Sequence, residues 1–373
     1  MGARLPTDGA RRGTVRGGGS SGVASAERHP TLATTDARAV RPAVVRALSA
    51  LARSDITWAL LRGESELSKP EGDVDILVAP TDIPRLAEEL AGLGFARLRR
   101  RGRGPHIFFL AYDAAEDRWV KLDVVTDLAF GPYQELRLGG GAGCLERRRS
   151  PGGLAVLAAD DGFWTLLLHC LLDGSGFPDT HRRALLSLAG GASASGPLAQ
   201  TIRGVLPENW GADALLGLAK AEDWVTLDRA APFIRAHWLS RCRVTGRARA
   251  LGNRTMRRLG RVPLLCGPGL AVLAWPGDSA LAAAVTERWA LPHRRLRLEG
   301  SLAARLRNLA LTRWHAARGR LVFVELADHG PPSRLLVRVI GARDLGALAF
   351  TGHDSAQEAT AEIWRRYVER SRG

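Results

Sequence analysis

The chain has 373 residues and a formal net charge of +15, because 53 Lys and Arg outnumber 38 Asp and Glu. Only Lys69, Lys121 and Lys220 are lysines, so the excess is arginine, which is typical of a GC-rich genome and does not by itself indicate nucleic-acid binding. The length leaves room for two domains, and an apolar content of 46% excludes a wholly disordered chain.

The N-terminal half is expected to form an α/β domain after a tail. Residues 1–35 are rich in Gly, Arg and Ser without hydrophobic periodicity, which predicts disorder. Residues 36–135 have patterns typical of helix, strand, strand, helix, strand and strand in that order. These elements are expected at residues 39–51, 56–61, 74–78, 83–93, 106–112 and 119–125.

A helical extension is expected over residues 136–234, and a basic segment follows it. The helices are predicted at residues 160–172, 182–188, 212–218 and 227–238. Residues 235–261 hold nine Arg and no acidic residue, which indicates either a linker or an exposed basic helix.

The C-terminal part, residues 262–373, alternates strand and helix patterns and predicts a second, smaller α/β domain. Strands are expected at residues 270–274, 320–325 and 334–340, and helices at 279–289, 302–315 and 356–370. The fold class of the whole chain is therefore α/β.

Two aspartates make residues 73–78 the most informative stretch. On a strand, residues two apart point to the same face about 6.6 Å apart, so Asp73 and Asp75 would lie side by side while Val74, Ile76 and Val78 face inward. Like charges this close are costly without a cation, and Mg²⁺ binds carboxylate oxygens while leaving room for phosphate. A solvated strand edge or a turn-capping pair is the alternative.

A third carboxylate, Asp123, stands amid the apolar residues of the strand expected at 119–125. A charge in such a run is expected only where it is exposed or paired. Three acids on adjoining strands could hold two metal ions about 3.5 to 4 Å apart, the arrangement that serves nucleotidyl transfer. Asp127 has the same parity but lies too far along the strand, so we leave it out of this set.

Gly63 and Ser65, followed by Asp73, Asp75 and Asp123, resemble the polymerase-beta-like nucleotidyltransferase superfamily, and more closely its bacterial branch. The resemblance covers about residues 55–131 and continues weakly to about residue 190. It implies an α+β core with a mixed sheet. It also implies an enzyme that uses two Mg²⁺ ions to move a nucleoside monophosphate from a nucleoside triphosphate to an unidentified acceptor.

The resemblance assigns roles to these residues. Asp73 and Asp75 would be catalytic and would ligate both metal ions, whereas Asp123 would complete the shell of the catalytic metal and act on the attacking hydroxyl. Gly63 and Ser65 would lie at the triphosphate. The chain departs from the family at residue 64, because a glutamate interrupts the usual Gly-Ser pair and places a carboxylate where phosphate is expected.

Nearby cations could also meet the triphosphate. Arg62, Lys69 and Lys121 are placed for this, although a salt bridge between Lys121 and one of the aspartates is an equal alternative. His106 and His169 each adjoin an apolar run and are expected to be structural.

The C-terminal domain resembles a shortened thymidylate-kinase-like domain that has degenerated. Residues 269–289 are predicted as strand, turn and helix, which is the context of a phosphate-binding P-loop. However, the turn has one Gly, no Lys, and Asp278, which would repel phosphate. The family ends its second strand with an Asp-Arg pair, where this chain has Glu325 and Leu326. The resemblance implies a P-loop-like α/β fold without phosphoryl transfer.

Alternatives to nucleotidyl transfer stay open. The chain could be an inactive binding or scaffold protein built from two degenerate nucleotide-binding domains, or a thymidylate-kinase-like phosphotransferase. Further arginine clusters occur at residues 97–103 and 147–149, but they lack the interleaved aromatic residues that stack on bases, so nucleic acid is the weaker partner.

Composition also bears on location. The uncharged stretch 262–277 has 16 residues, including three Pro and three Gly, and is shorter than the ~20 apolar residues of a membrane span. We therefore expect no membrane partner. The four cysteines are widely separated and lack metal-site spacing, which favours free thiols in a reducing cytoplasm.

Overall fold

The computed structural model of the chain describes most of the expected elements. The described residues are 41–62, 67, 73–98, 104–174, 176–242, 244–261, 270–274, 279–291, 293–316, 320–326, 347–349 and 355–372. The expected tail at 1–35 and the strand expected at 334–340 lie outside these ranges.

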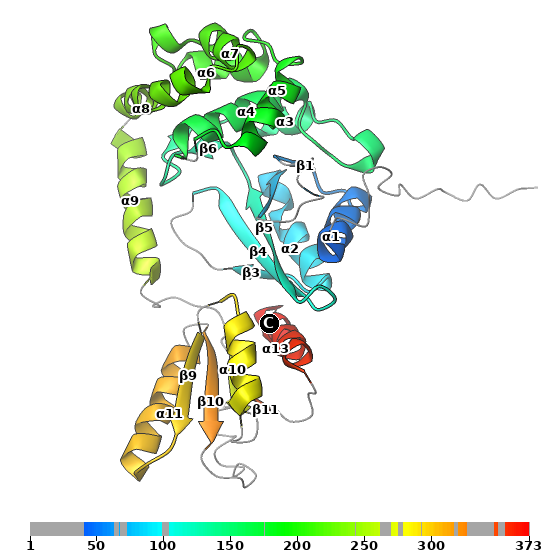
Figure 1. The fold of residues 1–373 in the computed structure, drawn as a ribbon, viewed down its shortest axis with the longest axis vertical. Coiled ribbons are helices and arrows are strands. Elements are labelled where there is room, and N and C mark those ends of the chain that lie inside the picture. The colour runs from blue at the N-terminus through cyan, green and yellow to red at the C-terminus, as the bar shows by residue number, and fades with distance from the viewer. Residues whose placement is uncertain are drawn as a thin grey trace, which may run out of the picture.

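A five-stranded mixed sheet forms the centre of the N-terminal part (Figure 1). Its order is β1-β2-β5-β4-β3, in which β2 and β5 are parallel and the other neighbours are antiparallel. The strands are β1 (Trp58–Leu60), β2 (Val74–Val78), β3 (Ala96–Leu98), β4 (His106–Asp113) and β5 (Arg118–Val125). The α/β prediction is thus confirmed here. The sequence analysis missed β3, because three residues show too little alternation to be recognised.

One face of this sheet is covered by α1 (Pro42–Arg53) and α2 (Ile83–Gly92). Apolar residues recur on each helix at helical spacing, and this stripe packs on Ile76, Val78 and Val124 of the sheet. The predicted inward face of β2 is therefore correct. The end of α2 is followed by Gly94 with φ of +86°, a conformation that glycine adopts at little cost.

The opposite face of the sheet meets a helical extension at one end. Here Leu77 and Val125 pack against α4, which is buried at almost every position, including Phe163 and Trp164. The helices of the extension are α3 (Gly141–Glu146), α4 (Ala159–Leu172), α5 (Asp179–Ala189), α6 (Pro197–Arg203), α7 (Ala212–Lys220) and α8 (Trp224–Arg241). The short elements are β6 (Ala129–Phe130), β7 (Leu136–Arg137) and the 3-10 turns η2 (Pro80–Asp82), η3 (Pro151–Gly153) and η4 (Glu208–Trp210).

The arginine-rich segment 235–261 is helical. Its first residues end α8, and the rest forms α9 (Val244–Arg261), which runs along one side of the molecule (Figure 1). Of the two forms expected, the structure has the exposed basic helix. Val244 is 83% exposed on α9, whereas Asn253 Nδ2 donates to the Tyr133 carbonyl at 2.8 Å. This helix therefore packs on the N-terminal part by its Asn253 side.

The C-terminal part contains a parallel sheet in the order β11-β8-β10-β9. Its elements are β8 (Leu270–Ala274), α10 (Ser279–Arg288), β9 (His293–Leu298), α11 (Leu302–Ala316), β10 (Leu321–Leu326), β11 (Ala347–Ala349) and α13 (Ala356–Arg372). The alternation of strands and helices is as predicted. The sequence analysis missed β9, because its sequence carries three arginines and it is an edge strand with a solvated side.

Three indole rings join the two sheets. Trp119 of β5 makes edge contacts with Trp289 and Trp364, at ring-centroid distances of 5.2 and 4.9 Å. Trp364 of α13 also donates from Nε1 to the Gly94 carbonyl at 2.9 Å. Leu110 and Tyr112 of β4 belong to the same buried cluster. The sheet face that α4 covers at one end is therefore covered at its other end by α10 and α13.

Replacing Trp364 by Ala is expected to lower the free energy of unfolding by about 3 to 5 kcal/mol, because a fully packed indole would leave a cavity between the two sheets. Urea denaturation of the full chain measures the loss. The Trp314→Ala variant provides the comparison, since this side chain on α11 is 45% exposed and should cost much less. Equal losses in the two variants would contradict the joining role of Trp364.

Candidate functional site

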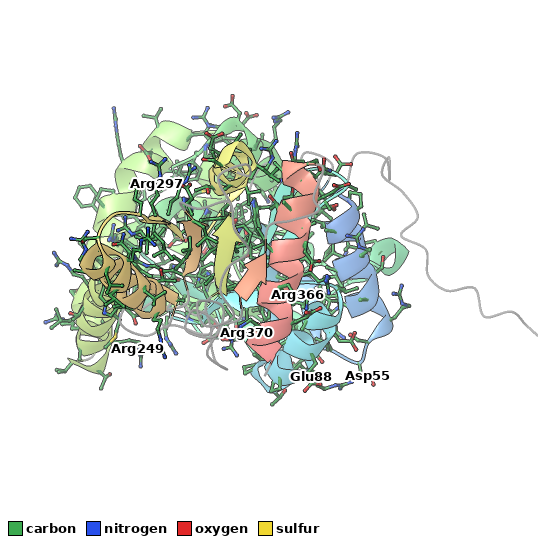
Figure 2. The ribbon with its side chains drawn as sticks, turned by 90° about the horizontal axis from the view of Figure 1, so that it is seen from below. Asp55, Glu88, Arg249, Arg297, Arg366 and Arg370 are labelled. Atoms are coloured by element: carbon green, nitrogen blue, oxygen red, sulfur yellow. The ribbon has the colours of Figure 1, made fainter. Side chains whose placement is uncertain are left out.

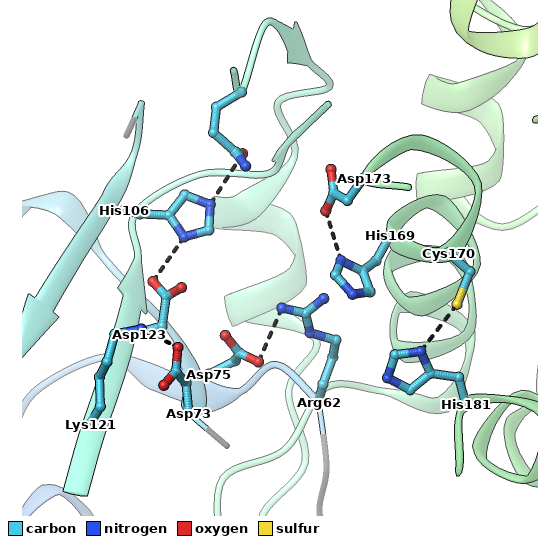
Figure 3. A network of polar contacts seen from close by, with 11 residues as sticks. Arg62, Asp73, Asp75, His106, Lys121, Asp123, His169, Cys170, Asp173 and His181 are labelled. Carbon is cyan, nitrogen blue, oxygen red and sulfur yellow. Dashed lines mark hydrogen bonds and ion pairs between the residues drawn. The ribbon is translucent and has the colours of Figure 1, made fainter. Parts of the chain in front are cut away.

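The β2–β5 pairing brings the predicted carboxylates together. Asp75 of β2 and Asp123 of β5 are direct cross-strand partners in the parallel register. Asp73, two residues before Asp75, shares its face of the sheet. Leu77 and Val125 on this face pack toward α4, so the three carboxylates belong to the face that α4 covers at one end. Figure 3 shows the three carboxyl groups close to one another.

Two of the three carboxylates are paired with a cationic side chain, and the third contacts a histidine (Figure 3). An Asp75 Oδ2 atom lies 3.0 Å from Arg62 Nη2. Asp73 accepts a hydrogen bond from the Lys121 ammonium, which also lies 4.6 Å from the centre of the Phe108 ring. The alternative of a salt bridge for Lys121 is thus the one found. Arg62 and Lys121, which were expected to meet phosphates, contact carboxylates in this structure.

Burial shifts the titration of the central carboxylate. The pKa of Asp75 is raised above its ordinary value, chiefly because its surroundings desolvate the charged form. The guanidinium of Arg62 opposes this shift, whereas the negative charges of Asp123 and Asp73 add to it. Asp123 and Asp73 are therefore near enough to Asp75 to make its negative charge unfavourable. A bound cation would relieve this repulsion.

His106 holds the third carboxylate. Its Nδ1 lies 2.8 Å from Asp123 Oδ1, and its Nε2 lies 3.1 Å from Gln134 Oε1. Gln134 adopts a φ of +55°, and a Cβ built on Gly104 would lie 2.7 Å from the Cβ of Gln134. The close approach requires glycine at residue 104. The sequence analysis assigned His106 a structural role, because only the β4–β5 register reveals that it adjoins Asp123.

The helical extension contributes a second set of polar groups. His169 of α4 pairs through Nδ1 with Asp173 Oδ2 at 2.7 Å, and Asp173 Oδ1 accepts from the Gly131 amide at 2.6 Å. The ring centroids of His169 and His181 are 5.6 Å apart. Arg62 lies between the carboxylates and His169 of α4 (Figure 3). His169 acts against the effect of burial on the pKa of Asp75. The i, i+4 spacing of His169 and Asp173 was the sequence signal that could have revealed this pair.

His181 of α5 is held in its neutral form. Its pKa falls to about 4, first because burial disfavours the imidazolium and then because His169 and Arg62 bring positive charge nearby. Cys170 Sγ lies 3.5 Å from His181 Nδ1. The pKa of a different thiol, Cys144, is raised to about 12 by burial, so Cys144 is protonated and poorly nucleophilic at neutral pH.

The carboxylates match a hard divalent cation in donor type, because Mg²⁺ binds carboxylate oxygens. Within the described ranges, however, no three His, Cys, Asp or Glu side chains are grouped as a ready-made metal site.

Other predicted site residues fall elsewhere. Gly63 and Ser65 lie outside the described residues, as do Lys69 and the turn at 275–278 that contains Asp278. Glu325, at the end of β10, is only 7% exposed and is paired with Arg295 and with Arg297 at 2.7 Å. Glu325 is therefore neutralised by two arginines of β9, of which Arg297 is labelled in Figure 2.

Comparisons with known proteins give no assignment. No family model matches the chain, and neither a curated protein nor a solved structure matches it. Among the helices of the described ranges, none is long and apolar enough to cross a membrane.

Replacing Asp75 by Asn tests its raised pKa. Folded Asp75 keeps its proton to a higher pH than the unfolded chain, whose Asp titrates near 3.8, so wild-type stability loses this contribution as pH rises from 3.8 through the raised folded pKa. We therefore expect the stability of Asp75→Asn relative to wild type to improve from about pH 4 toward neutrality. Urea titrations across this range measure it. A difference between the two proteins that does not vary with pH would contradict the shift.

Proposed function

We propose that the chain is a Mg²⁺-dependent nucleotidyltransferase that transfers a nucleoside monophosphate from a nucleoside triphosphate to a hydroxyl or phosphate acceptor. The observation that carries the proposal is the placement of Asp75 beside Asp123 on neighbouring parallel strands, with Asp73 on the same face. The resemblance of this region to the polymerase-beta-like superfamily supports the same reading. A cytoplasmic location would supply both the cation and the triphosphate.

Different residues of the chain would have different roles in such a reaction. Asp73, Asp75 and Asp123 would hold the divalent cations, which would offset charge on the triphosphate and assist the loss of pyrophosphate. Asp123, fixed by His106, would take the proton from an acceptor hydroxyl. The acceptor oxygen would then form a bond to the α-phosphorus, and the bond from that phosphorus to the pyrophosphate oxygen would break. Arg62 and Lys121 would bind phosphate oxygens.

A second candidate is a binding or scaffold protein without catalysis. The pairing of Asp75 and Asp73 with internal cations favours it, because such pairs can also serve only to stabilise a fold. For the C-terminal part, the parallel sheet with β8 followed by α10 supports a kinase-like fold, but Glu325 at the end of β10 is paired with two arginines. We do not propose kinase activity for it.

The Asp123→Asn variant tests the reaction. Purified wild-type protein is expected to release pyrophosphate from at least one nucleoside triphosphate in the presence of Mg²⁺ and a metabolite extract that supplies acceptors. The variant should lose at least about 100-fold in rate, because it lacks both a cation ligand and the proton acceptor. Circular dichroism checks that it folds.

Asp127→Asn is the matched control. Asp127 Oδ1 accepts from the Leu128 and Gly141 amides at 2.8 and 3.4 Å, and an asparagine keeps an oxygen acceptor there. This variant should retain wild-type rates. If wild type and Asp123→Asn release pyrophosphate equally, or if no triphosphate is turned over, the result would favour a binding or scaffold protein over an enzyme.

A further inference from the structure

We propose that Arg62 and Lys121 form an internal counter-ion set that closes the carboxylate site when it is empty, and that both side chains pass to the triphosphate when a divalent cation takes their aspartates. This inference rests on the proposed nucleotidyl transfer and concerns how the same site is gated.

The pairing is one to one. Asp75 and Asp73 each have one cationic partner, and the partners come from different places: Arg62 after β1 and Lys121 within β5. The third carboxylate, Asp123, is hydrogen-bonded to His106 at the start of β4. Because the pairs are partly shielded from water, with Arg62 19% and Asp75 18% exposed in their side chains, an unmatched charge there would be costly.

The cations are also placed to stay near the site after release. Lys121 is on the same strand and face as Asp123, two residues away, and its ammonium lies over the Phe108 ring. Arg62 lies between the carboxylates and the wall of α4 (Figure 3). A released guanidinium would therefore stay beside the carboxylates, where it could bind an incoming anion.

Competition follows from this arrangement. A divalent cation that takes Oδ2 of Asp75 would displace Arg62, and one that takes Oδ2 of Asp73 would displace Lys121, so each internal cation weakens divalent binding in the absence of nucleotide. A triphosphate gives the displaced side chains a new anionic partner and removes that penalty. By thermodynamic reciprocity, the divalent cation and the triphosphate should each strengthen the binding of the other.

The Arg62→Met variant separates this inference from a simple phosphate-binding role, because two effects should have opposite sign. Loss of the competing guanidinium should tighten binding of Mn²⁺ alone, on the order of threefold to tenfold. Loss of the phosphate ligand should weaken binding of a nonhydrolysable nucleoside triphosphate at saturating Mn²⁺ by about tenfold. Calorimetry on the full chain measures both affinities without turnover.

Two further variants complete the experiment. Lys121→Met should show the same pair of opposite changes, and it provides an independent test if Arg62→Met does not fold. Arg85→Met is the control, because Arg85 forms an exposed ion pair with Asp55 at 3.4 Å away from the carboxylates. It should change neither affinity.

The outcomes are distinguishable. Tighter Mn²⁺ binding together with weaker triphosphate binding supports the counter-ion set. Unchanged or weaker Mn²⁺ binding in both folded site variants overturns it, even if triphosphate binding falls. If wild type binds Mn²⁺ but no triphosphate, the proposed function and the transfer of the cations to a triphosphate both fail, whereas a gain in Mn²⁺ affinity in the variants would still support the resting counter-ion role.

Discussion

The parallel pairing of β2 with β5 is the constraint on which the candidate site depends. Asp75 and Asp123 repel each other, yet the register that makes them neighbours also packs Ile76 against Val124 on the opposite face, beneath α1 and α2. A slip of one residue would turn the aspartates into that core and the apolar residues out of it. The hydrophobic effect on one face of the sheet therefore fixes an unfavourable charge arrangement on the other.

Two separate parts of the chain cover the ends of the face that bears the carboxylates. The helical extension packs on Leu77 and Val125, whereas α10 and α13 pack around Trp119 and Tyr112. The aspartates lie between these two coverings. The burial that raises the pKa of Asp75 is thus a product of tertiary packing. Of the two cationic influences that oppose it, Arg62 follows the neighbouring strand β1, whereas His169 comes from α4, which is distant in the sequence.

Much of the fold could be predicted from the sequence, because helices and strands of eight or more residues have clear periodicity. The missed strands that extend the sheets, β3, β9 and β11, are short or arginine-rich, so their placement depends on neighbours and not on pattern. For the site, the spacing of Asp73 and Asp75 was informative. The partnership of His106 with Asp123 was hidden, because it depends on strand register, and that of His169 with the cluster depends on how α4 docks.

The indole cluster links the two parts of the chain on either side of the predicted boundary near residue 262. The two parts form separate sheets, but Leu110 and Tyr112 of the first part share one buried cluster with Val272, Phe323 and Trp364 of the second. Cutting the chain there would leave apolar side chains of β4 in water on the very face that carries the aspartates. The C-terminal part consequently covers one end of the N-terminal sheet, and the residues that make this contact are constrained by it.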